Sequence, residues 1–162
     1  MLNSHPHSRR PQLDNLDRRL LAHLQDDART SSAELARRVG LSGPGLQKRL
    51  KKLESRGVVR RYAALVDREA VGLDLLCFVQ VTLAHHRPNS AARFPGRVKE
   101  MREVLECYFL TGEFDYLIKI VVADHDELQK FLFNKLIKVA GVDRIRTSIV
   151  VKEVKATTSL PL

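Results

Sequence analysis

Apolar residues recur at the spacing of one helical face in three successive stretches near the start of the chain. The first stretch has Asp14 and Asp17 at its beginning, where acidic side chains suit the helix dipole. Its apolar face comprises Leu13, Leu16, Leu20, Leu21 and Leu24. Ser31 followed by Glu34 has the pattern of a capping box and predicts the start of a second helix. Its inner face is formed by Leu35, Ala36 and Val39.

Gly40 predicts the end of the second helix, because glycine readily adopts the left-handed conformation found at helix ends. Ser42 caps a third helix with Pro44 in its first turn, and Gly57 ends it. The buried stripe of that helix is Leu46, Leu50 and Leu53. Two helices joined by Gly40-Leu41-Ser42, with the small Ala36 where they cross, indicate a helix-turn-helix. The alternative is a three-helix bundle whose corner happens to have this spacing.

The side of the third helix opposite its leucines is basic and carries no carboxylate. A helix with such a face fits the major groove of DNA, where residues near its N-terminus reach base edges and cations meet phosphates. Gln47 and Lys48 are the candidates for base reading, and Lys51, Lys52 and Arg56 for backbone contact. The full predicted DNA-binding set is Ser42, Pro44, Gln47, Lys48, Arg49, Lys51, Lys52, Arg56, Arg60 and Arg61. For any single lysine, the alternative is an ordinary solvated surface charge.

The location of the excess positive charge in the sequence supports this prediction. The chain carries 28 Lys plus Arg against 19 Asp plus Glu, a net charge of +9. Residues 1–66 hold 14 of the cations and 6 of the acids, so their share is +8, and residues 67–162 carry only +1. Such a local excess predicts a polyanionic partner for one domain, and nucleic acid fits better than an anionic membrane because the basic part has a compact helical pattern.

The second half of the chain alternates strand and helix patterns. Strands are predicted at residues 75–84, 104–111, 115–122 and 142–154, and helices at 91–101 and 126–139, with the first helix beginning only at Pro95 as an alternative. The order strand-helix-strand-strand-helix-strand is the ferredoxin-like βαββαβ plan. Two helices cover one face of its sheet, yet the central strands look apolar on both faces. The sequence therefore predicts a homodimer formed through the uncovered face.

The predicted fold class is α+β, with a winged-type helix-turn-helix followed by this βαββαβ ligand-sensing and dimerisation domain. The predicted divisions are a flexible basic arm (1–12), a DNA-binding domain (13–63) from which a strand at 58–66 leads out, a linker (64–73), the second domain (74–155) and a tail (156–162). No apolar run is long enough for a membrane helix, and the first residues do not form a signal peptide. Cys77 and Cys107 lie far apart in apolar runs, which predicts buried thiols in a reducing cytoplasm and no disulfide, zinc site or other cofactor.

From Leu13 to Val154 the chain resembles the Lrp/AsnC (leucine-responsive/asparagine regulator, or feast/famine) family of transcriptional regulators. The motifs are Leu13-Asp14-Asn15-Leu16-Asp17, Arg38-Val39-Gly40-Leu41-Ser42, Arg49-Leu50-Lys51-Lys52-Leu53-Glu54 with Gly57-Val58-Val59, Thr111-Gly112-Glu113-Phe114-Asp115-Tyr116, and Arg146-Thr147 to Glu153-Val154. The resemblance implies a DNA-binding regulator and not an enzyme. It also implies dimers that assemble into octamers and an effector, usually an amino acid, bound between subunits.

Carried over by position, the resemblance places effector-binding residues at Gly112, Glu113, Asp115, His125, Thr147, Ser148 and Ile149. Asp115 suits an α-ammonium group, although a carboxylate there also caps a turn, so both roles stay open. Many relatives carry a larger side chain in place of Ser148, which leaves the effector unnamed. Two alternatives remain: an effector-independent, DNA-compacting architectural protein, and a relative of haem-pathway decarboxylases for which His85-His86 would be the candidate site.

Overall fold

The computed structural model describes residues 11–84 and 90–162, and the chain divides into two compact units. The first unit comprises residues 1–64 together with 155–162, and the second comprises residues 65–154. The C-terminal tail therefore belongs to the first unit. Gln25 holds it there: the Leu160 N–H donates to Gln25 Oε1 (2.7 Å), and Gln25 Nε2 donates to the Leu160 carbonyl (3.1 Å).

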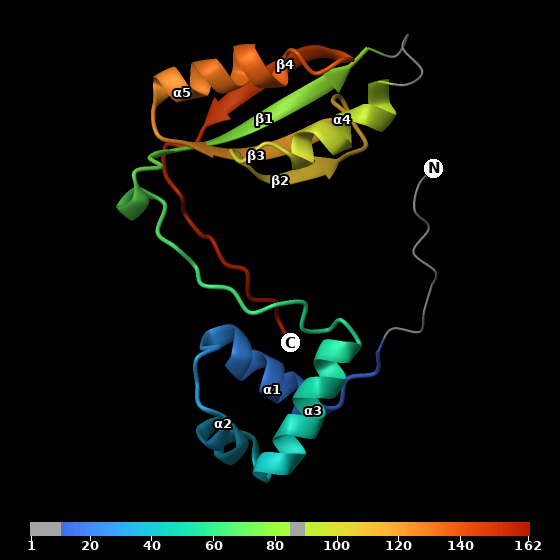
Figure 1. Cartoon of the computed structure of the whole chain (residues 1–162), viewed down its shortest axis with the longest axis vertical. Helices are drawn as coiled ribbons and strands as arrows, with labels where there is room; N and C mark the ends of the chain where they lie inside the picture. The colour runs from blue at the N-terminus through green and yellow to red at the C-terminus, as the bar shows by residue number, and fades with distance from the viewer. Residues whose placement is uncertain (1–10, 85–89) are drawn as a thin grey trace. The chain divides into compact units, whose positions relative to one another are not determined.

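The first unit has three helices, all at the predicted places (Figure 1): α1 (Asn15–Asp26), α2 (Ser32–Val39) and α3 (Gly43–Ser55). Asp14 and Asp17 form a reciprocal capping box at the start of α1. At α2 only half of the predicted capping box forms, because Ser31 accepts from the Glu34 N–H while the Glu34 carboxylate binds Arg37 and Arg38.

The core of this unit is made of the predicted apolar faces, with Leu20 and Leu46 fully buried and Ala36 buried where α2 meets α3. Gly40 has φ +73°, the left-handed conformation that ends α2 and begins the turn into α3. The predicted helix-turn-helix is confirmed.

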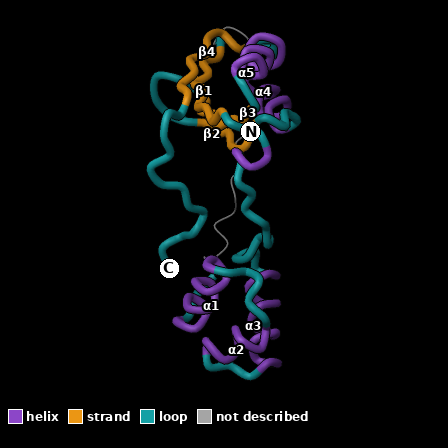
Figure 2. Tube along the Cα trace, turned by 90° about the vertical axis from the view of Figure 1, so that its left-hand side faces the viewer, coloured by secondary structure: helices purple, strands orange, loops and turns teal. Residues whose placement is uncertain are grey.

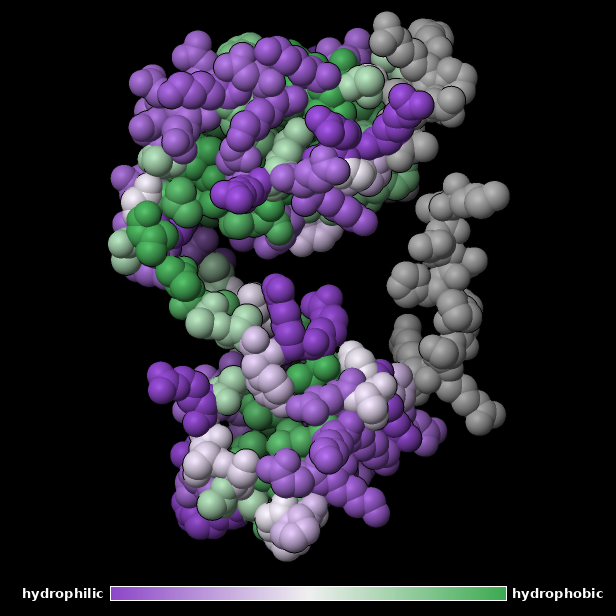
Figure 3. Space-filling view, in the orientation of Figure 1, coloured by the Kyte–Doolittle hydropathy of each residue, from purple (hydrophilic) through white to green (hydrophobic). Residues whose placement is uncertain are grey.

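The predicted strand at 58–66 is wrong: the structure has no strand in this segment. Val58 and Val59 pack against the helical core, and their N–H groups return to the Leu53 carbonyl. Beyond them, Leu65 and Val66 are 80% and 69% exposed. Figure 3 shows hydrophobic residues at the surface of the chain that leads from the first unit to the second. Alternating β-branched residues are not sufficient for a strand when no neighbouring strand supplies hydrogen bonds.

The second unit is a four-stranded antiparallel sheet in the order β2-β3-β1-β4, with its helices on one face (Figure 2). The strands are β1 (Leu75–Leu83), β2 (Val104–Phe109), β3 (Tyr116–Val122) and β4 (Val142–Ile149). The helices are α4 (Ser90–Lys99), α5 (His125–Lys130) and the π-helical η2 (Phe131–Leu136) that continues α5; a short 3₁₀ turn, η1 (Glu69–Val71), precedes the sheet. This is the predicted βαββαβ plan.

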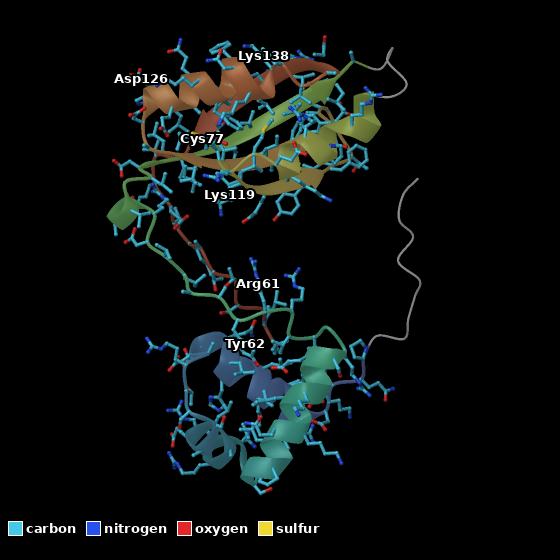
Figure 4. The ribbon with its side chains drawn as sticks, in the orientation of Figure 1. Arg61, Tyr62, Cys77, Lys119, Asp126 and Lys138 are labelled. Carbon is cyan, nitrogen blue, oxygen red and sulfur yellow. The ribbon has the colours of Figure 1, made fainter. Side chains whose placement is uncertain are left out.

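The helix-covered face of the sheet is the core. It consists of buried side chains from β1 and β3 packed on Phe94 of α4 and Phe131 and Leu136 of the last helix: Cys77, Val79, Val81, Leu83, Tyr116, Ile118, Ile120 and Val122. Burial raises the pKa of the Cys77 thiol, which lies between sheet and helices (Figure 4). A cysteine so placed acts as a small apolar side chain. The prediction of a buried thiol is wrong for Cys107, which is exposed on the edge strand β2.

Two local predictions for this unit need correction, and a third falls on residues that are not described. The helix at 91–101 begins before Pro95, which lies inside α4, so the alternative start at Pro95 is wrong. The last strand ends at Ile149 and not at Val154, because beyond the bond from the Val150 N–H to the Leu76 carbonyl (2.8 Å) the chain leaves β1. Residues 85–89, which include His85-His86, lie outside the described residues.

Candidate DNA-binding face and effector-binding surface

The buried leucines of α3 determine which side of the helix faces solvent. Leu46 and Leu53 are buried against α1 and α2, so the residues on the opposite side face solvent. We call this side the basic face; it consists of Pro44, Lys48, Lys51, Lys52 and Ser55, with Gln47 at its flank, and all are exposed. None of the three lysines forms an ion pair within residues 11–84 and 90–162. The structure thus leaves their charges available to an anion.

Gln47, the predicted base-reading residue, is held across the corner of the helix-turn-helix. Its Nε2 donates to Ser32 Oγ on the first turn of α2 (3.1 Å). Ser32 therefore borders the same surface, and the sequence analysis missed it because a contact between residues fifteen positions apart leaves no local pattern. Ser42, predicted to touch DNA, has its hydroxyl oxygen bound by the Gly45 N–H as the cap of α3.

Arg49 is the one predicted DNA-binding residue that the structure turns inward. Its Nη1 lies 2.7 Å from Asp14 Oδ2 and 2.6 Å from Asp17 Oδ1, which fixes α3 to the start of α1. Asp17 is the only buried charged residue in the described part of the chain, and its carboxylate is compensated by this guanidinium. Hydrogen bonding to Arg49 lowers the pKa of Asp14. We therefore assign Arg49 to positioning α3.

The remaining predicted cations continue the basic face beyond the helix. Arg56 forms the C-cap of α3, and Arg60 and Arg61 follow in the irregular segment after it; all three are exposed. Arg61 is labelled in Figure 4. This segment is held to α3 by Tyr62, whose hydroxyl donates to Glu54 Oε1 (2.9 Å). Glu54 is the only acidic residue of α3, and it does not belong to the basic face.

The predicted effector residues of the second unit fall into two groups. The first lies on the turn between β2 and β3, where Gly112 has φ +141°, a conformation that favours glycine. Asp115 closes this turn: its Oδ2 accepts the Leu83 N–H (2.7 Å), and its own N–H donates to the Val81 carbonyl (3.0 Å). Of the two roles left open for Asp115, the structure therefore shows the structural one.

The second group lies at the other end of the sheet. His125 begins α5, which follows β3 at the end opposite the turn, and Ile149 pairs with Cys77 near the start of β1. Seven residues of β3 span about 20 Å, so one chain does not bring His125 beside Asp115. The pairing register with β1 also places the predicted β4 residues on different faces of the sheet. Thr147 and Ile149 lie on the helix-covered face, and Ser148 lies on the uncovered face.

The uncovered face of the sheet is less apolar than predicted. Its centre is apolar, with Leu76 and Val121 buried and Phe78 half-buried. Lys119, on the central strand β3 opposite Phe78, interrupts the apolar residues and pairs with Glu106 on the edge strand β2, and the other edge strand, β4, adds Arg144 and Arg146. At one end of this face lies a hollow of about 240 Å³, which we call the polar hollow; it is lined by Gln80, Thr82, Glu113, Phe114, Arg144 and Arg146.

Comparison with known families decides what these two units are. Residues 13–60 match a winged helix-turn-helix DNA-binding domain, and residues 76–160 match the Lrp/AsnC ligand-binding domain. The chain is also 38% identical, over 148 residues, to the leucine-responsive regulatory protein of Salmonella typhimurium, covering 91% of this chain and 90% of the relative. The chain belongs to the Lrp/AsnC family. The leucine-responsive regulatory protein of Escherichia coli K12 matches to the same extent.

Solved structures of Lrp/AsnC regulators share the fold. A transcriptional regulator from Neisseria meningitidis in complex with L-methionine has a TM-score of 0.88 and 39% identity, with 93% of this chain and 97% of that chain covered. The Escherichia coli AsnC structure has a TM-score of 0.84 and 29% identity over 93% and 99% of the two chains. A feast or famine regulatory protein from M. tuberculosis, complexed with L-methionine, has a TM-score of 0.83 and 36% identity over 92% and 99%.

This Lrp/AsnC protein is accordingly a DNA-binding transcriptional regulator and not an enzyme, which removes the decarboxylase alternative. Its second unit is a small-molecule-binding domain by family. Across the described ranges, no helix combines the length and the apolar character that crossing a bilayer requires.

Proposed function

We propose that this protein reads a specific DNA sequence through the basic face and that an amino acid changes its DNA binding or its assembly. The observation that carries the first part is the set of three exposed lysines on α3, opposite a leucine stripe that fixes the helix in a helix-turn-helix. Support for the second part is the family of the second unit, together with two relatives whose structures contain L-methionine.

Assembly is part of the proposal. The apolar centre of the uncovered sheet face is the dimer interface, and dimers associate further into octamers, as the family resemblance implies. The separation of the predicted effector residues supports this, because seven residues of β3 lie between the turn carrying Asp115 and His125 at the start of α5. The effector then binds between subunits and links ligand binding to assembly.

Salt-dependent DNA binding tests the DNA-reading face. Each phosphate contact that is lost should reduce the slope of log affinity against log salt by about 0.9, so Lys48→Ala with Lys51→Ala should flatten it measurably. The matched control is Lys130→Ala with Lys138→Ala, which removes two exposed lysines of the second unit. An unchanged slope in the α3 variant would place the DNA-binding surface elsewhere.

An effector-independent architectural protein is the second candidate. Repeating the titration with each proteinogenic amino acid present decides between the two. An amino-acid regulator shows a changed affinity or sedimentation coefficient with at least one of them, whereas an architectural protein shows neither.

A further inference from the structure

A groove of about 1050 Å³ in the second unit is bordered by α4 on one side and by η2 on the other. Both helices cover the sheet face opposite to the proposed dimer interface (Figure 2), so pairing through the uncovered face leaves this groove open to solvent. Met101 and Val139 belong to its lining and also pack against the core, so they form an apolar bottom. We call this feature the interhelical groove.

Cationic side chains line the interhelical groove from both of its walls. Arg93 and Arg97 are four residues apart and therefore lie on one face of α4, and Arg102 is in the turn that follows this helix. On the opposite wall, Lys135 belongs to η2, and Lys138, labelled in Figure 4, lies in the turn after it. Like charges from separate elements thus border a common space.

The two carboxylates of the lining do not neutralise this charge. Glu100 accepts from Arg97 Nη1 (3.1 Å), and Glu103 accepts from Lys135, so each acid is already paired with one cation. With five cations and two acids, the lining has a net charge of +3, although residues 67–162 together carry only +1. The cations of the lining that form no ion pair within residues 11–84 and 90–162 are Arg93, Arg102 and Lys138.

We propose that the interhelical groove binds a nucleoside polyphosphate, with its phosphate groups on the three unpaired cations and its base against Met101 and Val139. A hollow lined by charges of one sign concentrates the electrostatic potential and attracts ions of the opposite sign. Guanidinium groups bind phosphate oxygens through paired N–H donors, and the lysine adds a compact positive charge. None of the predicted effector residues lines this groove, so the inference goes beyond the proposed amino-acid effector and does not depend on it.

Size and charge favour a nucleoside polyphosphate over other anions. A volume of about 1050 Å³ is at the upper end of the roughly 300–1,000 Å³ of small-molecule pockets, far more than one phosphate ion fills. A phosphate group carries about −1.5 to −2 charges at neutral pH, so two or more of them are needed to match the lining. Inorganic pyrophosphate would leave the apolar bottom uncovered, and so would a DNA backbone that contacts only the rim.

The test is fluorescence anisotropy of ATP labelled on its ribose, titrated with the full chain. The variants Arg93→Ala, Arg102→Ala and Lys138→Ala each remove one unpaired cation, and Lys138→Arg keeps the charge. The matched control is Lys130→Ala, which removes an exposed lysine of the same unit outside the groove. All of these positions are exposed, so the variants should fold, and their melting temperatures check this.

We expect each of the three alanine variants to bind labelled ATP about 10-fold more weakly, the lower end for charge-assisted bonds, because salt screens charges in an open groove. Lys138→Arg and Lys130→Ala should bind nearly like the wild type. Unlabelled ATP and GTP should displace the labelled ATP at lower concentrations than inorganic pyrophosphate does, because only the nucleotides contact the apolar bottom. Pyrophosphate that competes as well as ATP overturns the nucleoside assignment.

A second variant, Lys48→Ala with Lys51→Ala, controls for attraction of the nucleotide to the basic face of α3. Labelled ATP should bind this variant as it binds the wild type. Binding that is lost here and retained in the groove variants places the nucleotide on the basic face and overturns the inference.

The remaining outcomes separate the interhelical groove from the proposed function. Absence of ATP binding by the wild type overturns the groove, while amino-acid-dependent DNA binding would still stand. The DNA titrations contain no nucleotide, so the salt slope of Lys130→Ala with Lys138→Ala should equal that of the wild type. A reduced slope in that variant would make the groove a DNA contact and overturn the nucleotide site.

Discussion

Replacing Arg49 with methionine separates a structural role from a DNA-binding role. Methionine keeps an unbranched apolar side chain against α1 but removes both bonds, at 2.7 Å to Asp14 and 2.6 Å to Asp17. The Asp17 side chain is 6% exposed, so its carboxylate would be left in place without its cation. A residue that contacted phosphate would show the opposite pattern, with a loss in DNA binding and little change in stability.

The size of the effect follows from the exposure of the pair. Exposed ion pairs contribute about 0–1 kcal/mol, and breaking a fully buried pair costs about 3–5 kcal/mol. The pair between Asp17 and Arg49 lies between these limits, because the arginine side chain is 25% exposed and the aspartate nearly buried. We expect Arg49→Met to lower the free energy of unfolding of the first unit by about 2–3 kcal/mol.

Urea unfolding, followed by circular dichroism of the helical signal, measures this loss. A double-mutant cycle with Asp17→Asn isolates the pairwise interaction, since the two single changes should be less than additive. DNA titrations at several salt concentrations, under conditions where the variant is folded, should give an unchanged log–log slope. A slope reduced by about 0.9 with stability intact would refute the assignment and return Arg49 to the DNA-binding set.

Three further predictions address the proposed dimer interface, the stability of the first unit in acid, and the role of Asp115 in the turn between β2 and β3. Phe78→Glu places a charge at the centre of the uncovered sheet face, so sedimentation should show dissociation to monomers; a dimer that persists would contradict the proposed interface. Arg37 and Arg38 lower the pKa of Glu34 from 4.5 to about 2. The Glu34 ion pairs therefore stabilise the fold above pH 4.5, and this contribution is lost as the pH falls from there towards 2; urea unfolding of Glu34→Gln over that range should lack this part of the pH dependence. Asp115→Ala should cost about 1–2 kcal/mol in thermal unfolding, because the Leu83 N–H loses its acceptor, whereas Asp115→Asn should retain most of that stability. If Asp115 also receives an effector ammonium group, Asp115→Asn should weaken calorimetric effector binding about 10- to 150-fold.

The helices of the first unit could be predicted from the sequence because their signals are local. A cap, an apolar stripe and a glycine at the end of a helix all act within one or two turns, and the structure confirms them at Ser31, Gly40 and Ser42. The same reasoning placed the lysines of the basic face correctly opposite the leucines. Order and spacing of the apolar segments were also sufficient for the βαββαβ plan.

Features that depend on tertiary contacts were not predictable in this way. Arg49 shares the composition of the basic face, and only the packing of α1 against α3 brings Asp14 and Asp17 to its guanidinium. Residues 58–66 have a strand-like pattern, but a strand also needs a neighbour, which the pattern does not contain. Three charges of the uncovered face, Glu106, Arg144 and Arg146, lie on the edge strands, for which the alternation of the central strands gives no information, whereas Lys119 lies on the central strand β3 and was overlooked.

The fold fixes the candidate effector residues at separate places in one chain. The turn that carries Glu113 and Asp115 is fixed by bonds to β1, and the β4 residues are fixed by their register with the same strand, so neither group can move towards the other without breaking the sheet. A ligand that needs both groups must therefore recruit the missing one from another subunit. A ligand held only by the turn needs one subunit. The dependence of ligand affinity on protein concentration distinguishes these arrangements. An intersubunit site loses affinity as the assembly is diluted to monomers, and a site within one chain keeps its affinity.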